Sequence, residues 1–129
     1  MVKLGKHEDE RGVIQDLFGP VEGVVTRIFT KSGAIRGNHV HYETTQWTYV
    51  LEGHLQVTTR KPGANATSRT YGPHQVACEE PGTAHAWLAL DDVTVLVFSK
   101  GPRSGEDYET DVFRMTGADR LIAPMEWDK

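Results

Sequence analysis

Short apolar segments alternate with clusters of glycine, proline and polar residues along the whole chain, and no long segment has the 3.6-residue period of a helix. Within 24–30, for example, Thr26 and Ile28 fall on one face of an extended strand, and Arg27 and Phe29 fall on the other. Many short strands at short, even spacing predict an all-β sandwich or barrel. The predicted strands are 13–18, 24–30, 37–42, 46–51, 54–60, 68–71, 75–78, 85–90 and 93–100.

The C-terminal part of the chain has a less regular pattern. Residues 111–115 are compatible with one more strand, and residues 117–125 are compatible with a short helical turn. A length of 129 residues corresponds to one domain of ordinary size, with no room for a second.

Composition and charge argue against several classes of function. The net charge is −4 and no basic run occurs, which argues against a nucleic-acid partner and against a polybasic membrane anchor. The longest apolar runs cover only a few residues, so no segment is long enough to span a bilayer. Cys78 is the single cysteine, so an intrachain disulfide is excluded, and residues 1–12 contain no apolar segment typical of a signal peptide. We therefore expect a cytoplasmic protein.

Three histidines and a glutamine carry the strongest chemical signal. His39 and His41 are two residues apart, so they project from the same face of a strand. Gln46 follows after four residues, and His85 comes directly after a Pro-Gly turn. Imidazole nitrogen is a good ligand for divalent transition metals such as Zn, Fe, Mn or Ni, and an amide oxygen can complete the set. The pair alone is also typical of exposed histidines on a strand.

The order of these residues resembles both signature motifs of the cupin superfamily. The first motif runs G-(x)5-H-x-H-(x)3-4-E-(x)6-G, and here its positions are Gly33, His39, His41, Gln46 and Gly53, with Gln46 in place of glutamate. The second runs G-(x)5-P-x-G-(x)2-H, and residues 81–85 fit its end with the proline displaced by one position. The resemblance implies a single cupin domain over 1–129, with a motif core at 33–90 and a tail at 101–129. It also implies a jelly-roll β-barrel of two antiparallel sheets with its site inside.

Further stretches resemble sugar-nucleotide cupins of the RmlC-like kind. Residues 9–12 are similar to the start of such proteins. Residues 36–41 resemble both the C-terminal cupin domain of capsular-polysaccharide UDP-sugar enzymes and the dTDP-4-keto-6-deoxyhexose 3,4-ketoisomerases. Residues 80–85 favour the first set, and residues 105–108 resemble the second. The likeness implies epimerisation or ketoisomerisation of an NDP-4-keto-6-deoxy sugar for cell-surface polysaccharide, by proton abstraction next to the C4 ketone.

Two assignments of the site residues follow from these resemblances. In the first, His39, His41, Gln46 and His85 hold a divalent transition metal, and Tyr108 moves protons. In the second, His39 and His41 are themselves the catalytic acid and base. One nitrogen cannot bind a metal and carry a proton at the same time, so the two assignments exclude each other at any one atom. The sequence leaves both open, and His85 favours the metal.

Two arginines are predicted to bind substrate. Arg36 lies beside the histidine pair, and Arg27 is a weaker candidate of the same kind. A guanidinium pairs with phosphate in a fork, so either is suited to a diphosphate. The alternative is a solvated strand end. Two other functions also remain open: a metal-dependent cupin oxygenase or other small-molecule enzyme, and a non-catalytic sugar-binding cupin.

One strand face is predicted to form an interface. Trp47, Tyr49 and Leu51 share the face opposite to Gln46, so they point outward if Gln46 lines the barrel. A run of large apolar side chains on an outer face predicts a homodimer. The alternative is packing under the N-terminal strand of the same chain. Cys78 is predicted to be a buried small hydrophobic residue.

Overall fold

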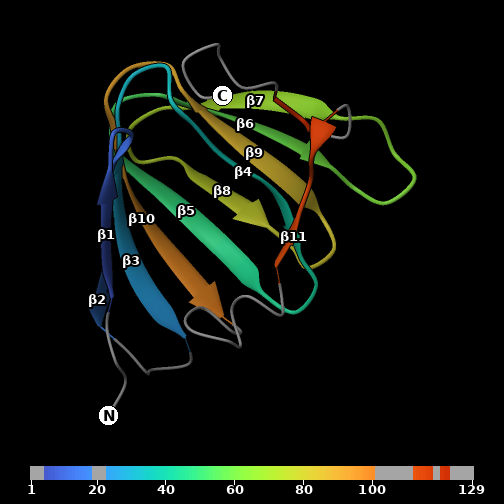
Figure 1. Cartoon of the computed structure of the whole chain (residues 1–129), viewed down its shortest axis with the longest axis horizontal. Coiled ribbons are helices and arrows are strands. Elements are labelled where there is room, and N and C mark those ends of the chain that lie inside the picture. Colours follow the sequence, from blue (N-terminus) through green and yellow to red (C-terminus); the bar gives the residue numbers. More distant parts are fainter. Residues whose placement is uncertain (1–4, 19–22, 101–111, 118–119, 123–129) are drawn as a thin grey trace.

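The computed structural model describes residues 5–18, 23–100, 112–117 and 120–122, which form two antiparallel sheets packed face to face (Figure 1). The first sheet has the spatial order β1 (Lys6–Asp9), β2 (Gly12–Phe18), β3 (Val24–Thr30), β10 (Val93–Lys100), β5 (Thr45–Glu52) and β8 (Val76–Glu79). The second has the order β11 (Val112–Arg114), β4 (Ile35–His41), β9 (Ala84–Ala89), β6 (Leu55–Arg60) and β7 (Thr67–Tyr71). The predicted all-β jelly-roll barrel is confirmed.

The core lies between the two sheets, where the inward side chains of both meet. Along β5, Thr48 and Val50 are fully buried while Trp47 is 39% exposed, as the period of a strand requires. Register then brings inward residues of neighbouring strands together, because Val95 of β10 pairs with Val50. The buried apolar cluster comprises Ile28, Val50, Leu55, Val57, Ala77, Trp87, Ala89, Val93, Val95 and Val97.

The structure extends the predicted set of strands at the two ends of the chain. β1 was not predicted, because its sequence Lys-His-Glu-Asp has no apolar alternation; it forms by antiparallel pairing with β2. β11 lies within the predicted segment 111–115. In the segment 117–125, the amide of Arg120 donates to the carbonyl of Gly117 at 3.3 Å, which closes one turn, and residues 118–119 and 123–125 lie outside the described residues. No helix in the described parts of the chain is long and apolar enough to cross a membrane.

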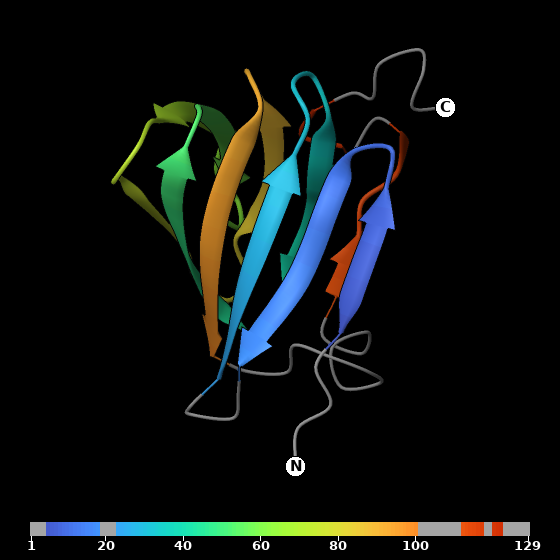
Figure 2. The ribbon, with the colours of Figure 1, turned by 90° about the vertical axis from the view of Figure 1, so that its left-hand side faces the viewer.

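The outer face of the first sheet, which faces the viewer in Figure 2, carries large apolar side chains according to the exposure of its residues. Trp47 of β5 lies between Phe98 of β10 and Cys78 of β8, and Phe98 is 42% exposed. Cys78 is exposed, so the prediction of a buried cysteine is wrong: it follows Ala77, whose side chain takes the inward position on this edge strand. β1 is an edge strand of the same sheet, so it does not cover this face.

Candidate metal and substrate site

A β-bulge in β4 determines which side chains enter the barrel. Gly37 pairs with Ala86 of β9 and His39 pairs with His85, so Asn38 is an extra residue without a partner position on β9. Asn38 has φ +58°, in the left-handed region that asparagine tolerates better than most residues. The bulge therefore shifts the alternation of β4 by one residue.

The shifted alternation brings an arginine and a histidine to the same face. In a regular strand Arg36 and His39 would point to opposite faces. Here Arg36 is opposite Trp87 and His39 is opposite His85, and Trp87 and His85 are two residues apart on β9. All four side chains line one cavity inside the barrel. The bulge is thus the local device that places a cation beside the histidines.

The three histidines of the sequence motifs form one cluster. Their ligand nitrogens all lie within 4.8 Å of one another. The Nε2 atoms of His39 and His85 are 3.0 Å apart, and the ring centroids of His39 and His41 are 4.6 Å apart. His41 and His85 are 2% and 3% exposed, whereas His39 is half-buried. The cluster is therefore open to the cavity mainly through His39.

This cluster fits a divalent transition metal. The 3.0 Å between the Nε2 atoms of His39 and His85 is the length of a hydrogen bond between the two rings, and it also equals the separation of two ligands at right angles that are each about 2.1 Å from one ion. Burial, and then the charge of His41, lower the pKa of His85 to about 4, so its imidazole is neutral near pH 7. A neutral imidazole presents the lone pair that a metal ligand requires.

The cavity beside the histidines is small, and its charged side chains are all cationic. It has a volume of about 250 Å³, and no acidic residue occurs among the described residues that line it. Gln46, the predicted fourth ligand, is buried and lines the same cavity. The lining residues are Arg11, Ile14, Ile28, Arg36, Gly37, His39, Gln46, His85, Trp87, Val97 and Arg114. Such a cavity suits an anionic or carbonyl-bearing ligand with an apolar side.

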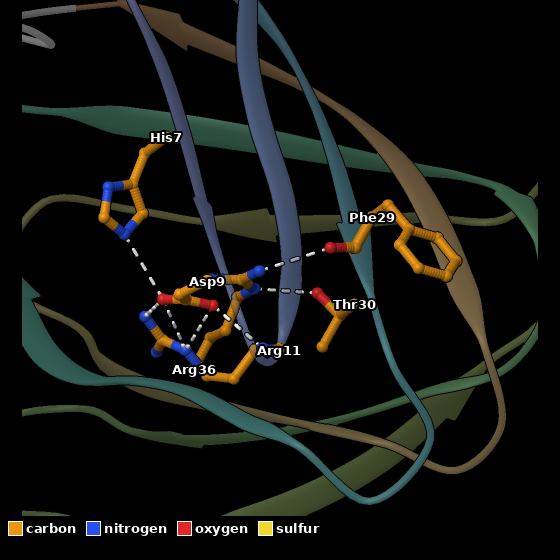
Figure 3. Close-up of polar contacts among 6 residues, drawn as sticks. All are labelled: His7, Asp9, Arg11, Phe29, Thr30 and Arg36. Carbon is orange, nitrogen blue, oxygen red and sulfur yellow. Dashed lines mark hydrogen bonds and ion pairs between the residues drawn. The ribbon is translucent and has the colours of Figure 1, made fainter.

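Arg36 is held in the cavity wall by β3. Its Nε donates to Thr30 Oγ1 at 2.8 Å, and a terminal nitrogen donates to the carbonyl of Phe29 at 3.2 Å (Figure 3). Burial, and then the charge of Arg11, lower its pKa to about 10, while Asp9 opposes the shift. The guanidinium keeps its charge at neutral pH, and its direction is fixed by β3.

The turn between β1 and β2 brings a second arginine to the same region. Arg11 donates to Asp9 Oδ2 from Nε at 3.1 Å and from a terminal nitrogen at 2.6 Å, and His7 lies 3.2 Å from the same oxygen (Figure 3). The Arg11 hydrogen bond holds the pKa of the Asp9 carboxyl far below its usual range. Asp9 thus stays ionised and fixes the direction of Arg11.

The remaining predicted residues lie elsewhere. Arg27 is exposed on the face of β3 opposite to Thr26 and Ile28, so the structure does not bring it to the cavity. Its predicted role in phosphate binding has no support from its position. Tyr108, together with residues 105–107, lies outside the described residues.

Glu79 is an interior acid that sequence reasoning missed. It is 2% exposed on β8, directly opposite Gln46. Its carboxylate accepts from Trp87 Nε1 at 3.3 Å and from Thr48 Oγ1 at 3.5 Å. Burial raises its pKa to about 7, although the Trp87 hydrogen bond opposes the shift. The available signal was the alternation of β8, which places Glu79 on the same inward face as Ala77.

Comparison with known proteins supports this architecture. A family model described as Cupin matches residues 20–120. The structure is similar to the capsular polysaccharide assembling protein CapF from Staphylococcus aureus, with 18% identity and a TM-score of 0.75 over 89% of this chain and 35% of that one. It is also similar to oxalate decarboxylase from Bacillus subtilis, with 23% identity and a TM-score of 0.72 over 87% of this chain and 30% of that one. The chain therefore spans about a third of the length of these structures. No curated protein sequence matches it.

Proposed function

The chain belongs to the cupin family, and we propose that it epimerises or ketoisomerises an NDP-4-keto-6-deoxy sugar for cell-surface polysaccharide. The observation that carries the proposal is the cluster of His39, His41 and His85 at a small cavity that also contains arginines. The similarity to CapF, a capsular polysaccharide assembling protein, supports the polysaccharide context. In this reaction a proton leaves the carbon next to the C4 ketone and returns on the other face or at another carbon.

The chain's own residues supply binding, orientation and charge. His39, His41 and His85 would hold a divalent transition ion, with Gln46 as a neutral fourth ligand. Such an ion, when bound, is a Lewis acid that polarises a carbonyl oxygen. Arg36, fixed by Thr30, adds a positive charge to the cavity wall that binds and orients a substrate oxygen. Ile14, Ile28 and Val97 give the cavity an apolar side against which a sugar ring can pack.

The proton needs a carrier that is not a metal ligand. If all three histidines are ligands through Nε2 or Nδ1, the carrier is another group, and Tyr108 remains the predicted one. If no metal binds, His39 and His41 remain the predicted acid and base. The neutral state of His85 and the ligand-like nitrogen spacing support the first assignment. The two assignments differ in the metal content of active protein.

We also propose the ligand class, the oligomeric state and the location of this protein. The ligand is a small molecule, a nucleotide sugar, and the chain acts as a homodimer through the outer face that contains Trp47, Tyr49 and Leu51. A cytoplasmic location agrees with a sequence that contains one cysteine.

Deuterium exchange tests the reaction directly. With UDP- and dTDP-4-keto-6-deoxyhexoses in deuterated water, metal-loaded protein should introduce deuterium next to the ketone, as read by NMR or mass spectrometry. His41→Ala should abolish exchange under either assignment, whereas Arg36→Ala should mainly raise the substrate concentration required. Arg27→Ala, on the outer face, is the matched control and should leave exchange unchanged. No exchange with either sugar at full metal loading would overturn the proposal.

A second function has support of its own. The similarity to oxalate decarboxylase and a cationic cavity of about 250 Å³ both favour a metal-dependent cupin enzyme that acts on a small carboxylate, in the class that includes cupin oxygenases. Carbon dioxide release or oxygen consumption with small dicarboxylates, without exchange on keto sugars, would establish that function instead. Binding of a sugar without either activity would establish a non-catalytic sugar-binding cupin.

A further inference from the structure

A second cavity adjoins the histidine cavity where the turn between β1 and β2 meets β4 and β11. It has a volume of about 330 Å³ and shares Arg11, Gly37 and Arg114 with the histidine cavity. We call the histidine cavity the inner chamber and the second cavity the outer chamber. Ligands of drug size occupy pockets of about 300–1,000 Å³. The inner chamber is therefore too small for a whole nucleotide sugar, and a ligand of that kind has to extend into the outer one.

The outer chamber is rich in arginine. Arg11, Arg114 and Arg120 line it, and Glu10 is the acidic residue among its described lining residues. Asp9, which pairs with Arg11, adds a second carboxylate, so three guanidinium groups against two carboxylates leave one positive charge in excess at the chamber. The guanidinium fork matches the geometry of phosphate oxygens, and such charge-assisted pairs are stronger than neutral hydrogen bonds.

The outer chamber is built by the same bulge that forms the inner one. The Asn38 side chain accepts from the amide of Leu121 at 2.8 Å and donates to the carbonyl of Ile122 at 3.0 Å. The carbonyl of Asn38 accepts from the amide of Met115 at 2.7 Å. Asn38 thereby fixes the chain on both sides of Arg120 and just after Arg114.

Strand pairing places Arg114, which lines both chambers, beside His39. Arg114 of β11 is the Cα partner of His39, and His39 is also the Cα partner of His85. Cross-strand partners point to the same face of a sheet, so Arg114 lies beside the histidine that is most open to the cavity. A phosphate held by Arg114 would therefore sit next to a group that reacts at the histidines.

We propose that the outer chamber is the diphosphate subsite of this protein, with Arg114 and Arg120 as its principal ligands and Arg11 as a third. This inference rests on the proposed function, because it assigns the two chambers to the two parts of a nucleotide sugar. The sugar occupies the inner chamber beside His39, and the diphosphate occupies the arginine-lined outer chamber. Phosphate recognition then falls to residues that come from the two ends of the chain, and Arg27 has no part in it.

Binding of UDP to the full-length, metal-loaded protein tests the subsite without any chemistry on a sugar. Isothermal titration calorimetry should detect UDP binding, and uridine, which lacks phosphate, should bind at least about tenfold more weakly. Arg114→Ala and Arg120→Ala should each weaken UDP binding at least about tenfold, because each removes a charge-assisted pair. Arg27→Ala is the matched control, an exposed arginine on the outer face of the barrel, and should leave UDP binding unchanged.

Folding can be separated from binding in this experiment. Arg114 and Arg120 are both exposed, so their alanine variants should keep the thermal unfolding transition of the parent, and Arg114→Lys should restore part of the affinity. UDP affinity that is equal in Arg27→Ala, Arg114→Ala and Arg120→Ala, or no UDP binding at all, would overturn the proposal. Arginine-dependent UDP binding without exchange on keto sugars would support the subsite and refute the isomerase. Exchange on keto sugars without arginine-dependent UDP binding would refute the subsite and support the isomerase.

Discussion

The interior of the barrel has an apolar end and a polar end, and the same strands build both. On β5 the inward residues run from Val50 to Gln46, and on β9 they run from Ala89 to His85. At the apolar end, Leu55 and its neighbours are fully buried and form the main core cluster. At the polar end, the equally buried positions carry imidazole, amide and carboxyl groups, whose burial costs free energy unless they are paired.

Stability therefore comes mainly from the apolar end of the barrel, and the proposed function comes from the polar end. Burial of apolar area stabilises the barrel at about 25 cal/mol per Å². The polar end buries less apolar area. It also buries Glu79 and His85, and burial moves the pKa values of both side chains far from their usual range. Substitutions at the two ends should therefore give opposite patterns: loss of stability without loss of metal at one, and loss of metal with little loss of stability at the other.

The largest expected effect is loss of metal from the polar end. Purified parent protein should contain close to one divalent transition ion per chain by elemental analysis. His41→Ala should lower metal affinity more than about 100-fold, because it removes a ligand rather than a supporting group, whose loss alone costs 10–100-fold. His54→Ala, at an exposed histidine paired with Asp91, is the matched control and should retain the metal. Protein that folds but cannot be loaded with metal would leave only the acid–base assignment.

At the apolar end, Leu55→Ala should lower the free energy of unfolding by about 2–5 kcal/mol, because Leu55 is 0% exposed and its loss leaves a cavity. Urea unfolding monitored by tryptophan fluorescence measures the change. The folded variant should still bind one metal ion per chain. If Leu55→Ala lost metal as readily as His41→Ala, the two ends would not be separable.

Glu79→Gln should change how stability depends on pH in the metal-free protein. The pKa of Glu79 is about 7 in the folded chain and near 4.5 when unfolded, so its contribution is present below pH 4.5 and lost as pH rises to 7. The pKa of His85 is about 4 folded and near 6.5 unfolded, so its contribution is present above pH 6.5 and lost as pH falls to 4. Between pH 4.5 and 6.5, rising pH therefore lowers the contribution of Glu79 to stability and raises that of His85, so the two effects oppose each other.

Glu79→Gln removes the contribution of Glu79 to this pH dependence and leaves that of His85. Glu79→Gln should be more stable than the parent at pH 7 by on the order of 2–3 kcal/mol, and it should lose stability more steeply than the parent as pH falls from 6.5 to 4.5. Denaturant unfolding at several pH values measures both effects. Glu80→Gln, at the exposed neighbour, is the control and should follow the parent curve. Parallel curves for all three proteins would show that Glu79 titrates normally in the folded chain.

The smallest effect on the interior is expected from a change outside it. Trp47→Lys places a charge at the centre of the outer apolar face and should convert the predicted homodimer to a monomer, as measured by light scattering at tens of micromolar protein, roughly the middle of the usual affinity scale. Metal content should be unchanged, because Trp47 points away from the barrel. A parent protein that is already monomeric at this concentration would count against the interface.

The sequence alone determined the parts of this protein that depend on local period. Alternation with a period of two predicted nearly every described strand and the outward direction of Trp47. The spacing of His39 and His41, followed by His85 after its turn, identified the cluster that the structure brings together. These features could be predicted because a strand's side-chain directions follow from its own backbone.

Only the tertiary structure decided the features that depend on pairing between distant strands. The extra residue Asn38 is visible only against β9, yet it is what brings Arg36 to the side of His39. Register likewise places Glu79 opposite Gln46 and Arg114 beside His39, although these partners are far apart in the sequence. The physical reason is that a strand's period says which residues share a face, whereas register and bulges, which are properties of two strands together, say which face meets which neighbour.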